Sequence, residues 1–495
     1  MKASSEVPDV PLPTEAQFFG HPRGLATLYF TEMWERFSYY GMRALLILFM
    51  TASVEKGGLG FTDSKSGAIY GLYTAMVYMV SLPGGWIADR ILGQRKSVLY
   101  GGIVIACGHF CMAMPGLTFF YIGLGLIVIG TGLLKPNIST MVGALYTPED
   151  NRRDAGFSIF YMGINLGAFL SPLVCGYVGE KINWHWGFGL AGIGMTIGLI
   201  QYVLGAKYLG TAGLYPAPAE SPEAAAKLKR NLLLGVGIAA ALIALTTLVL
   251  PVTAQGVSDA GGVLLLVVTF ATFAWLIFFA DATPVERKRF VVIFVLFLAA
   301  SLFWSAFEQA GSTLNLFADR STAKVIFGFE YPASWFQSVN SLFIITLAPV
   351  LAWVWIRLGK LEPSIPAKFS LGLIFVGLGF LVMAGGALAA ANGVQVSSVY
   401  LWVCYLLHTI GELCLSPVGL SAMTKLAPVR FVGLMMGVWF LASAVGNYIG
   451  GRLASLYGSF GVPSLFGIVA AFCIALGLVL AMIVKPIRKM MGGVK

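Results

Sequence analysis

The sequence predicts an all-α polytopic membrane protein with fourteen transmembrane helices, arranged as six, two and six along the chain. The 495 residues are 58% hydrophobic and only 11% charged, with a mean hydropathy of +0.83. Apolar segments of about twenty residues, long enough to cross a bilayer, recur from one end to the other. Lysine and arginine gather in alternate connecting loops, as in polytopic proteins. Together these observations exclude a water-soluble globular protein.

The first part of the chain contains a tail and six predicted spans. Residues 1–23 are polar and lack the apolar core of a signal peptide, so we interpret them as a cytoplasmic N-terminal tail. A six-helix bundle is expected at 24–208. Its apolar segments lie near 24–52, 66–88, 97–115, 117–141, 154–177 and 184–208.

The middle region, 209–288, is interpreted as a cytoplasmic linker followed by two extra transmembrane helices. The linker includes the polar stretch YPAPAESPEAAAKLKR (215–230), and the two spans near 231–251 and 261–280 contain no charged residue. A helix that lines a polar pathway should carry polar groups. We therefore expect this pair to pack at the side of the bundle and face lipid.

The last part of the chain repeats the six-helix pattern. A second bundle is expected at 289–486, with a cytoplasmic tail at 487–495. Its spans lie near 289–316, 331–357, 368–391, 397–424, 431–456 and 463–486. The loops on the side of the N-terminus hold most of the lysine and arginine, which places both termini in the cytoplasm.

Two six-helix halves joined by a long connection are typical of secondary transporters built from repeats, which hold their substrate near the midplane between the halves. One chain supplies a complete pathway, so we expect a monomer to be functional. The six cysteines lie in apolar segments without a metal-ligand spacing, which predicts no metal and no cofactor. The basic residues are spread over loops rather than gathered in one patch, which argues against nucleic acid.

Seven ionisable residues lie inside the predicted spans, where a charge costs about 2.5–3.5 kcal/mol and therefore needs a partner or a function. On the first span, positions 32, 35, 36, 39, 40 and 43 form one polar stripe. The other charged residues lie on the fourth, seventh and tenth predicted spans of the two bundles. The seven are Glu32, Glu35, Arg36, Arg43, Lys135, Glu308 and Glu412.

These charges suggest a gate that is coupled to protons. They could be structural ion pairs, but midplane bases in one half and acids in the other favour pairs that close when the halves approach. Partial desolvation raises the pKa of such a carboxylate, and a neighbouring basic group lowers it. Breaking or forming the ion pair can therefore change whether the carboxylate holds a proton. No nucleotide-binding G-x-x-x-x-G-K-[ST] occurs, which leaves an ion gradient as the energy source.

Six motifs in order resemble the proton-dependent oligopeptide transporter family, a branch of the major facilitator superfamily. EMWERFSYYG (32–41) resembles the family's E-x-x-E-R-F signature, and the extra helix pair resembles bacterial members. The likeness covers about 18–486. The other motifs are GGWIADRILG (84–93), GTGLLKPN (130–137), FSIFYMGINLGAF (157–169), FWSAFEQ (303–309) and GELCLSPVGL (411–420).

The resemblance implies a substrate site for di- and tripeptides. Arg43 and Lys135 are expected to face the peptide carboxylate, and Glu412 its amino end. A basic wall opposite an acidic wall suits a zwitterion of fixed length. The resemblance adds two amides and a set of aromatic and hydroxyl pocket residues, which are Asn165, Asn340, Tyr40, Tyr78, Trp304, Trp439 and Ser443.

The resemblance also implies the coupling groups. Glu308 is expected to pair with Arg43, and Lys135 with Glu412. Glu32, Glu35 and Arg36 are similar to the family's coupling cluster, and which carboxylate carries the transported proton stays open. Asp89 and Arg90 lie in a loop that resembles the superfamily's cytoplasmic gate. No histidine occurs at 66–88, so a scheme based on a histidine of the second helix does not apply.

The sequence therefore predicts a proton-coupled symporter that imports di- and tripeptides across a bacterial inner membrane by alternating access, and not an enzyme. One alternative is a symporter of the same fold for an anion such as nitrate, but a lone anion gains no favourable contact from an acidic wall. A second is a sensor without transport, although no sizeable soluble output domain is present. A third, an intramembrane enzyme, lacks a nucleophile–base pair or a metal-ligand motif.

Overall fold

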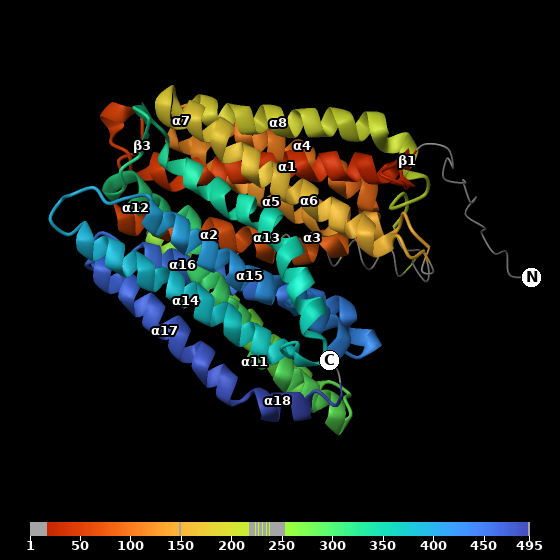
Figure 1. Ribbon diagram of the computed structural model, residues 1–495. Helices are drawn as coiled ribbons and strands as arrows, with labels where there is room; N and C mark the ends of the chain where they lie inside the picture. Colours follow the sequence, from red (N-terminus) through yellow and green to blue (C-terminus); the bar gives the residue numbers. More distant parts are fainter. Residues whose placement is uncertain are drawn as a thin grey trace, which may run out of the picture.

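The computed structural model describes residues 17–147, 150–216 and 253–493, together with Glu223, Ala226, Arg230, Leu234 and Gly237. Helices dominate this described part (Figure 1), and its strands form two short antiparallel hairpins. The first hairpin pairs β1 (Gln17–Phe18) with β2 (His21–Pro22), directly before the first helix. The second pairs β3 (Val325–Ile326) with β4 (Phe329–Glu330) through Phe327 and Gly328, which both have positive φ.

The first half of the described chain contains eight α-helices and four short 3₁₀ or π segments. They are α1 (Gly24–Thr51), η1 (Val54–Lys56), α2 (Asp63–Met79), α3 (Ser81–Ile87), η2 (Ala88–Leu92), α4 (Gln94–Met112), α5 (Leu117–Gly143), α6 (Arg153–Ser171), η3 (Pro172–Gly176), α7 (Tyr177–Lys181), α8 (Trp184–Gly205) and η4 (Ala206–Leu209).

The second half has the same helical character. Its elements are α10 (Ala254–Ala274), η5 (Trp275–Phe279), α11 (Pro284–Phe307), η6 (Glu308–Gly311), α12 (Thr313–Ser321), η7 (Ala333–Phe336), α13 (Gln337–Leu358), η8 (Gly359–Leu361), α14 (Ile365–Ala389), α15 (Val399–Leu426), η9 (Val429–Phe431), α16 (Val432–Ala454), α17 (Val462–Met482) and α18 (Val484–Met490).

The helices pack as two groups that lie against each other. In the first group α1 packs on α6 and α8, and α4 packs on α5 and α8; in the second, α14 packs on α15 and α17, and α11 on α16. The main contacts between the groups are α2 with α16 and α6 with α13. Figure 1 shows most of the first group, coloured red to yellow, above most of the second, coloured green to blue, with α13 of the second group lying against α6 of the first. We call these groups the N-terminal half and the C-terminal half.

Ten helical segments of the described chain are long and apolar enough to cross a membrane. The predicted span near 261–280 is present but begins earlier, at Ala254, so it includes the charged residue Asp259. The span predicted near 231–251 lies outside the described residues. The total of fourteen therefore stays a prediction, as do the domain boundaries.

The helix α10 lies at the edge of the molecule, where it packs on α2 and α16. Its side chains Val263, Val267 and Phe270 are exposed. Asp259 pairs with Arg452 of α16 at 2.6 Å, so the helix is held by one ion pair and an apolar face. This placement agrees with a lipid-facing position.

Two predicted spans are interrupted, which differs from the expected continuous helices. The segment at 66–88 is divided into α2 and α3 after Met79, whose carbonyl cannot bond Pro83 because proline lacks a backbone N–H. The segment at 289–316 begins at Pro284, fixed by a capping box between Thr283 and Glu286, and breaks at Glu308. This second break places a carboxylate where the helix ends.

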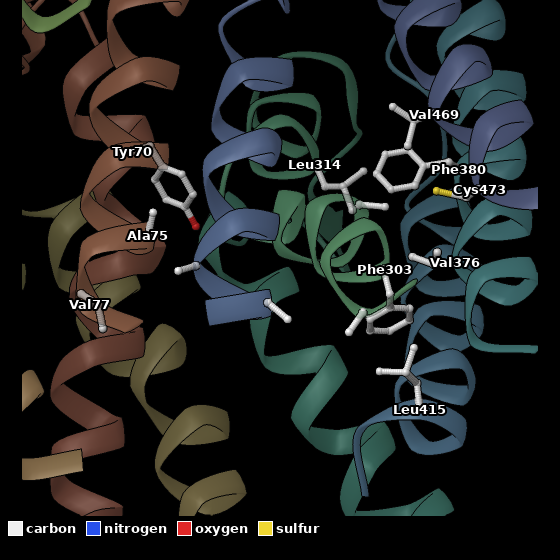
Figure 2. Close-up of a cluster of buried hydrophobic side chains, with 14 of the residues drawn as sticks. Tyr70, Ala75, Val77, Phe303, Leu314, Val376, Phe380, Leu415, Val469 and Cys473 are labelled. Atoms are coloured by element: carbon white, nitrogen blue, oxygen red, sulfur yellow. The ribbon is translucent and has the colours of Figure 1, made fainter. Parts of the chain in front are cut away.

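Buried apolar side chains continue from one half into the other. Figure 2 shows part of this cluster, with Tyr70 of α2 on one side and Phe303, Leu314 and Phe380 of the C-terminal half on the other. The helix α1 lies deepest, since 23 of its 28 residues are buried. It therefore faces protein rather than lipid, which is what its four charged residues require.

The halves are bonded to each other at one end of the molecule. We call the end with α7, β3 and α12 the distal end, and the end with β1 and α18, where the described chain begins and finishes, the terminal end (Figure 1). At the distal end Arg320 pairs with Asp63 at 2.7 Å and Lys181 with Glu330 at 3.3 Å. At the terminal end Arg152 pairs with Asp150 and Arg430 with Glu286, each within its own half.

Candidate functional site

A buried ion pair joins the two halves at the centre of the molecule. Arg43 Nη2 of α1 lies 2.6 Å from Glu308 Oε2, and both side chains are more than 90% buried. The same Nη2 donates to the Glu308 carbonyl at 3.3 Å, and Nε donates to the Tyr70 hydroxyl at 2.7 Å. The structure thus confirms the expected pairing of Arg43 with Glu308. Removing one partner of a buried pair leaves an uncompensated charge, at a cost of about 3–5 kcal/mol.

The backbone of the C-terminal half must come very close for this contact to form. The helix α11 ends at Phe307, and the short helix η6 carries Glu308 to Gly311. A Cβ atom added to Gly311 would lie 1.9 Å from the Tyr70 hydroxyl and 2.8 Å from Arg43 Nε. Only glycine therefore allows α1 and α2 to reach this turn.

The cluster on α1 pairs internally. Arg36 Nε lies 3.2 Å from Glu32 Oε1, four residues earlier, and the guanidinium also binds Glu35, with Nη2 donating to Oε1 at 2.6 Å. All three side chains are almost fully buried. Glu32 Oε2 is buried and has no hydrogen-bond partner among the described residues. One carboxylate oxygen of the cluster is thus available to a proton.

Lys135 of α5 lies at the interface between the halves. Its Nζ is 3.8 Å from the centre of the Tyr78 ring and 6.0 Å from that of Phe440 on α16, in the other half. In the described part of the chain no carboxylate lies within ion-pair distance of Lys135. The pair expected between Lys135 and Glu412 is therefore not formed in this conformation, because the lysine rests on an aromatic ring instead.

Glu412 of α15 binds a neutral side chain instead of Lys135. Glu412 Oε2 accepts a hydrogen bond of 3.0 Å from Asn340 Nδ2, which also donates to Thr409 Oγ1 at 3.0 Å. The carboxylate is 8% exposed and, among the described residues, has no cationic partner within ion-pair distance. The C-terminal half thus presents an acid that is oriented by an amide but not neutralised.

The remaining predicted pocket residues differ in the contacts that their side chains make. Tyr40 lies beside both arginines of α1, with its ring centre 5.7 Å from Arg43 Cζ, and Trp304 has a buried Nε1 without a partner in the described structure. Asn165 instead donates to the Tyr161 carbonyl of its own helix at 3.0 Å. Trp439 and Ser443 are buried on α16, where Trp439 packs against Gly419.

The predicted gate residues lie at the terminal end, on η2. Asp89 and Arg90 are both exposed, and Asp89 accepts a long hydrogen bond of 3.4 Å from Gln94. In the described residues neither makes an ion pair. A fixed pair occurs nearby in the α5–α6 connection, where hydrogen bonds from Arg152 lower the pKa of Asp150 to about 2. This loop pair stays ionised at neutral and mildly acidic pH.

Sequence reasoning missed several residues that the fold brings to this interface. Tyr70 accepts a hydrogen bond from Arg43, and Thr409 accepts one from Asn340, the amide that also binds Glu412. At the distal end Glu180 of α7 accepts 2.9 Å bonds from the backbone N–H groups of Ala333 and Ser334, in the other half. A polar residue in an apolar span was the available signal for Tyr70. Glu180 gave none, because its partners are backbone groups.

Metal binding finds no support in the described residues, where no group of three histidine, cysteine or acidic side chains could hold an ion. His408 is buried one turn before Glu412, and its Nε2 lies 3.2 Å from the Val376 carbonyl. Its ring nitrogens also lie 3.5 Å and 4.0 Å from Cys404 Sγ.

Two helical halves that close on buried charges define a multi-pass membrane transporter rather than an enzyme. The model of the POT family matches residues 95–464. The chain belongs to this family.

Curated relatives support the assignment along the whole chain. The chain is 43% identical to the peptide transporter YePEPT of Yersinia enterocolitica over 499 residues, with 96% of each chain covered. It is 38% identical to the di-/tripeptide transporter of Lactococcus lactis subsp. cremoris, with 97% of this chain and 99% of that one covered.

Solved structures agree with the fold. A crystal structure of a peptide transporter, POT, in complex with sulfate superposes with a TM-score of 0.92 at 44% identity, covering 98% of both chains. A POT family transporter in complex with 5-aminolevulinic acid gives a TM-score of 0.89 at 38% identity, covering 97% of this chain and 99% of that one.

Proposed function

We propose that this protein is a symporter that carries di- and tripeptides together with protons by alternating access. The names of its relatives support peptides as the substrate class. The observation that carries the proposal is the buried pair of Arg43 and Glu308, which joins the halves at their centre. A charge pair in that position responds both to a proton and to a charged ligand.

The peptide is held by its two charged ends. Lys135, which rests on Tyr78 without a carboxylate partner in the described chain, offers a cation to the peptide carboxylate, together with Arg43. Glu412, oriented by Asn340, offers an anion to the amino group. A peptide between these walls pairs two charges that the empty protein leaves unpaired, so binding draws the halves together.

Protonation of Glu308 opens the central pair. A neutral carboxyl group no longer neutralises Arg43, and the guanidinium is then free to bind the peptide carboxylate. Glu32 adds a second acceptor, because its Oε2 is buried without a hydrogen bond in the described structure. Protonation of Glu308 therefore frees Arg43 for the peptide carboxylate, so binding of the proton favours binding of the peptide, which is the requirement for symport.

The contacts between the halves support an inward-facing position of this conformation in the proposed cycle. The distal end is closed by Asp63 with Arg320 and by the Glu180 bonds to η7, while the pairs of Arg152 with Asp150 and of Arg430 with Glu286 at the terminal end each lie within one half. With both termini in the cytoplasm of a bacterial inner membrane, as the loop charges predict, the site faces inward. A single chain contains every group named in this cycle, so a monomer suffices.

Uptake of labelled dialanine into liposomes containing the purified protein tests the proposal. An inward proton gradient should drive accumulation, and an uncoupler should abolish it. Accumulation that persists without the gradient would exclude proton symport. Failure to carry dialanine or trialanine, with uptake of nitrate instead, would favour the anion transporter.

A further inference from the structure

A large basic cavity lies at the terminal end of the C-terminal half, apart from the interface between the halves. Its volume is about 830 Å³, and it is bounded by residues 359–368, by the end of α15 from Pro417 to Lys425, and by α18. Six basic side chains line it against one carboxylate, that of Glu362. The six are Lys360, Lys368, Lys425, Lys485, Arg488 and Lys489.

The single carboxylate is already engaged. Glu362 Oε1 lies 2.5 Å from Lys368 Nζ, and Lys368 is buried with its Nζ 4.8 Å from the Trp355 ring centre. In the described structure, Lys360, Lys485, Arg488 and Lys489 form no ion pair. Several like charges around one hollow create a positive potential that an anion would relieve.

The short helix α18 is anchored so that its charges point away from the core. Ile487 and Met491 are buried, with exposed fractions of 4% and 1%, whereas Lys485, Arg488 and Lys489 are exposed. The helix packs on α11, α14 and α17. Its bases are therefore presented to the cavity by a fixed support rather than by a loose tail.

Exposed apolar side chains occur close in sequence to the lining residues, at the ends of transmembrane helices, and we take them as the apolar border of the cavity. Ile356 and Leu361, beside Lys360, are each 81% exposed, and Met482, beside α18, is 74% exposed. Such side chains at the end of a transmembrane helix contact acyl chains. A soluble anion would use the bases but would leave this border unused.

We propose that the cavity binds the phosphate-bearing headgroup of an anionic phospholipid from the leaflet at the terminal end. The bases bind the phosphates, and the acyl chains lie along Ile356, Leu361 and Met482. Basic pockets between transmembrane helices commonly bind such headgroups. The cavity falls within the range of about 300–1,000 Å³ that holds drug-sized ligands, so a headgroup with two phosphates, as in cardiolipin, fits better than a single phosphate.

The bound lipid would link α18 to the helix that carries Glu412. Pro417 and Val418 of α15 line the cavity, and Pro417 lies five residues beyond Glu412, about 7.5 Å along the helix. The headgroup thus touches a pathway helix without touching the charged site. This inference stands whether or not the protein transports peptides.

Lipid binding by the full-length chain tests the proposal. The protein, purified in detergent and depleted of lipid, is titrated with cardiolipin, with phosphatidylcholine and with glycerol phosphate, and the bound molecules are counted by native mass spectrometry. We expect cardiolipin to bind at least tenfold more tightly than phosphatidylcholine, and glycerol phosphate to compete only weakly. Equal binding of both lipids would contradict the proposal. Full displacement of cardiolipin by glycerol phosphate would assign the cavity to a free anion and would also overturn the proposal.

Matched variants locate the site. The combined Lys360→Gln, Lys485→Gln, Arg488→Gln and Lys489→Gln variant should lose at least tenfold in cardiolipin affinity. The control removes the same charges at exposed positions of the same end, with Lys96→Gln, Lys207→Gln, Arg287→Gln and Lys288→Gln, and should bind as the parent does. Lys→Arg changes at 360, 485 and 489 should keep binding, which separates lost charge from misfolding. Equal losses in both glutamine variants would refute a specific cavity.

Discussion

Arg43 and Glu308 form an ion pair at 2.6 Å between the first helix of one half and the end of α11 in the other. Both side chains are buried, so neither charge is stabilised by bulk water. The strength of this pair depends on the protonation of Glu308, and the approach of the halves depends on the pair. In the proposed symport, this contact links the proton to the closure of the halves.

The Glu308→Gln variant should separate exchange from accumulation. Glutamine keeps the shape of the side chain but cannot titrate, so peptide exchange across the membrane should continue while proton-driven accumulation is lost. Counterflow of labelled dialanine measures the first, and uptake under a proton gradient measures the second. Undiminished accumulation by the variant would exclude Glu308 as a coupling group.

Substitutions in the basic wall and in the acidic wall should each weaken the binding of dialanine. Lys135→Ala removes the cation for the carboxylate, and Glu412→Gln removes the anion for the amino group. An interaction with a charged group contributes about 1.5–3 kcal/mol, so each variant should weaken dialanine binding by about tenfold to a hundredfold.

Blocked competitors separate the two roles. Dialanine amide, which lacks the free carboxylate, should bind the parent protein as weakly as dialanine binds Lys135→Ala. N-acetyl-dialanine, which lacks the free amino group, should bind the parent as weakly as dialanine binds Glu412→Gln. Competition constants in liposomes measure both effects. If either variant kept the affinity of the parent for dialanine, the corresponding wall would have no role in binding.

Gly311→Ala should disturb the central pair without removing either charged group. The new methyl group would collide with the Tyr70 hydroxyl, so uptake should fall at least tenfold. Adding Tyr70→Phe removes the colliding oxygen and should restore part of the activity. Gly385→Ala on α14, where an added Cβ meets nothing within 4 Å, is the control. A Gly311→Ala protein with normal uptake would show that the close approach is not needed.

The distal closure should depend on Glu180 more than on the neighbouring Lys181. Glu180 is held in a partly buried site by two backbone N–H groups of the other half, whereas the pair of Lys181 with Glu330 is largely exposed. Exposed pairs contribute about 0–1 kcal/mol, and bonds to a buried carboxylate contribute more.

Spin labels on residues 57 and 328, in loops of opposite halves at the distal end, would measure this difference. Glu180→Ala should shift the population toward longer distances, while Lys181→Gln should leave the distribution close to that of the parent. Equal distributions in all three proteins would remove Glu180 from the closing contact.

The sequence was sufficient for the class of fold and for the chemistry of the interface, because charged residues inside apolar spans are rare and costly. It predicted the pair of Arg43 with Glu308, which the structure confirms. It did not predict the break of the helix at Glu308, since FWSAFEQAG contains no proline and only one glycine. Contacts through backbone groups, such as those of Glu180, leave no sequence signal.

The expected pair of Lys135 with Glu412 shows a different limit. Opposite charges on facing helices indicate which groups can meet, but not in which conformation they meet. In this conformation Lys135 lies over Tyr78 and Glu412 binds Asn340, so each group is held by its own half apart from one distant ring. The sequence identified the groups, and the closure of the distal end decides which of them are in contact.

Peptide-driven proton flux tests the central claim most directly. Liposomes containing the protein and a pH-sensitive dye, at equal pH inside and outside, are given dialanine outside with the membrane potential clamped to zero. The account predicts that the lumen acidifies with the parent protein and stays unchanged with Glu308→Gln, although the variant still exchanges peptide. Acidification of equal size in both proteins, or peptide entry without any acidification in the parent, would contradict it.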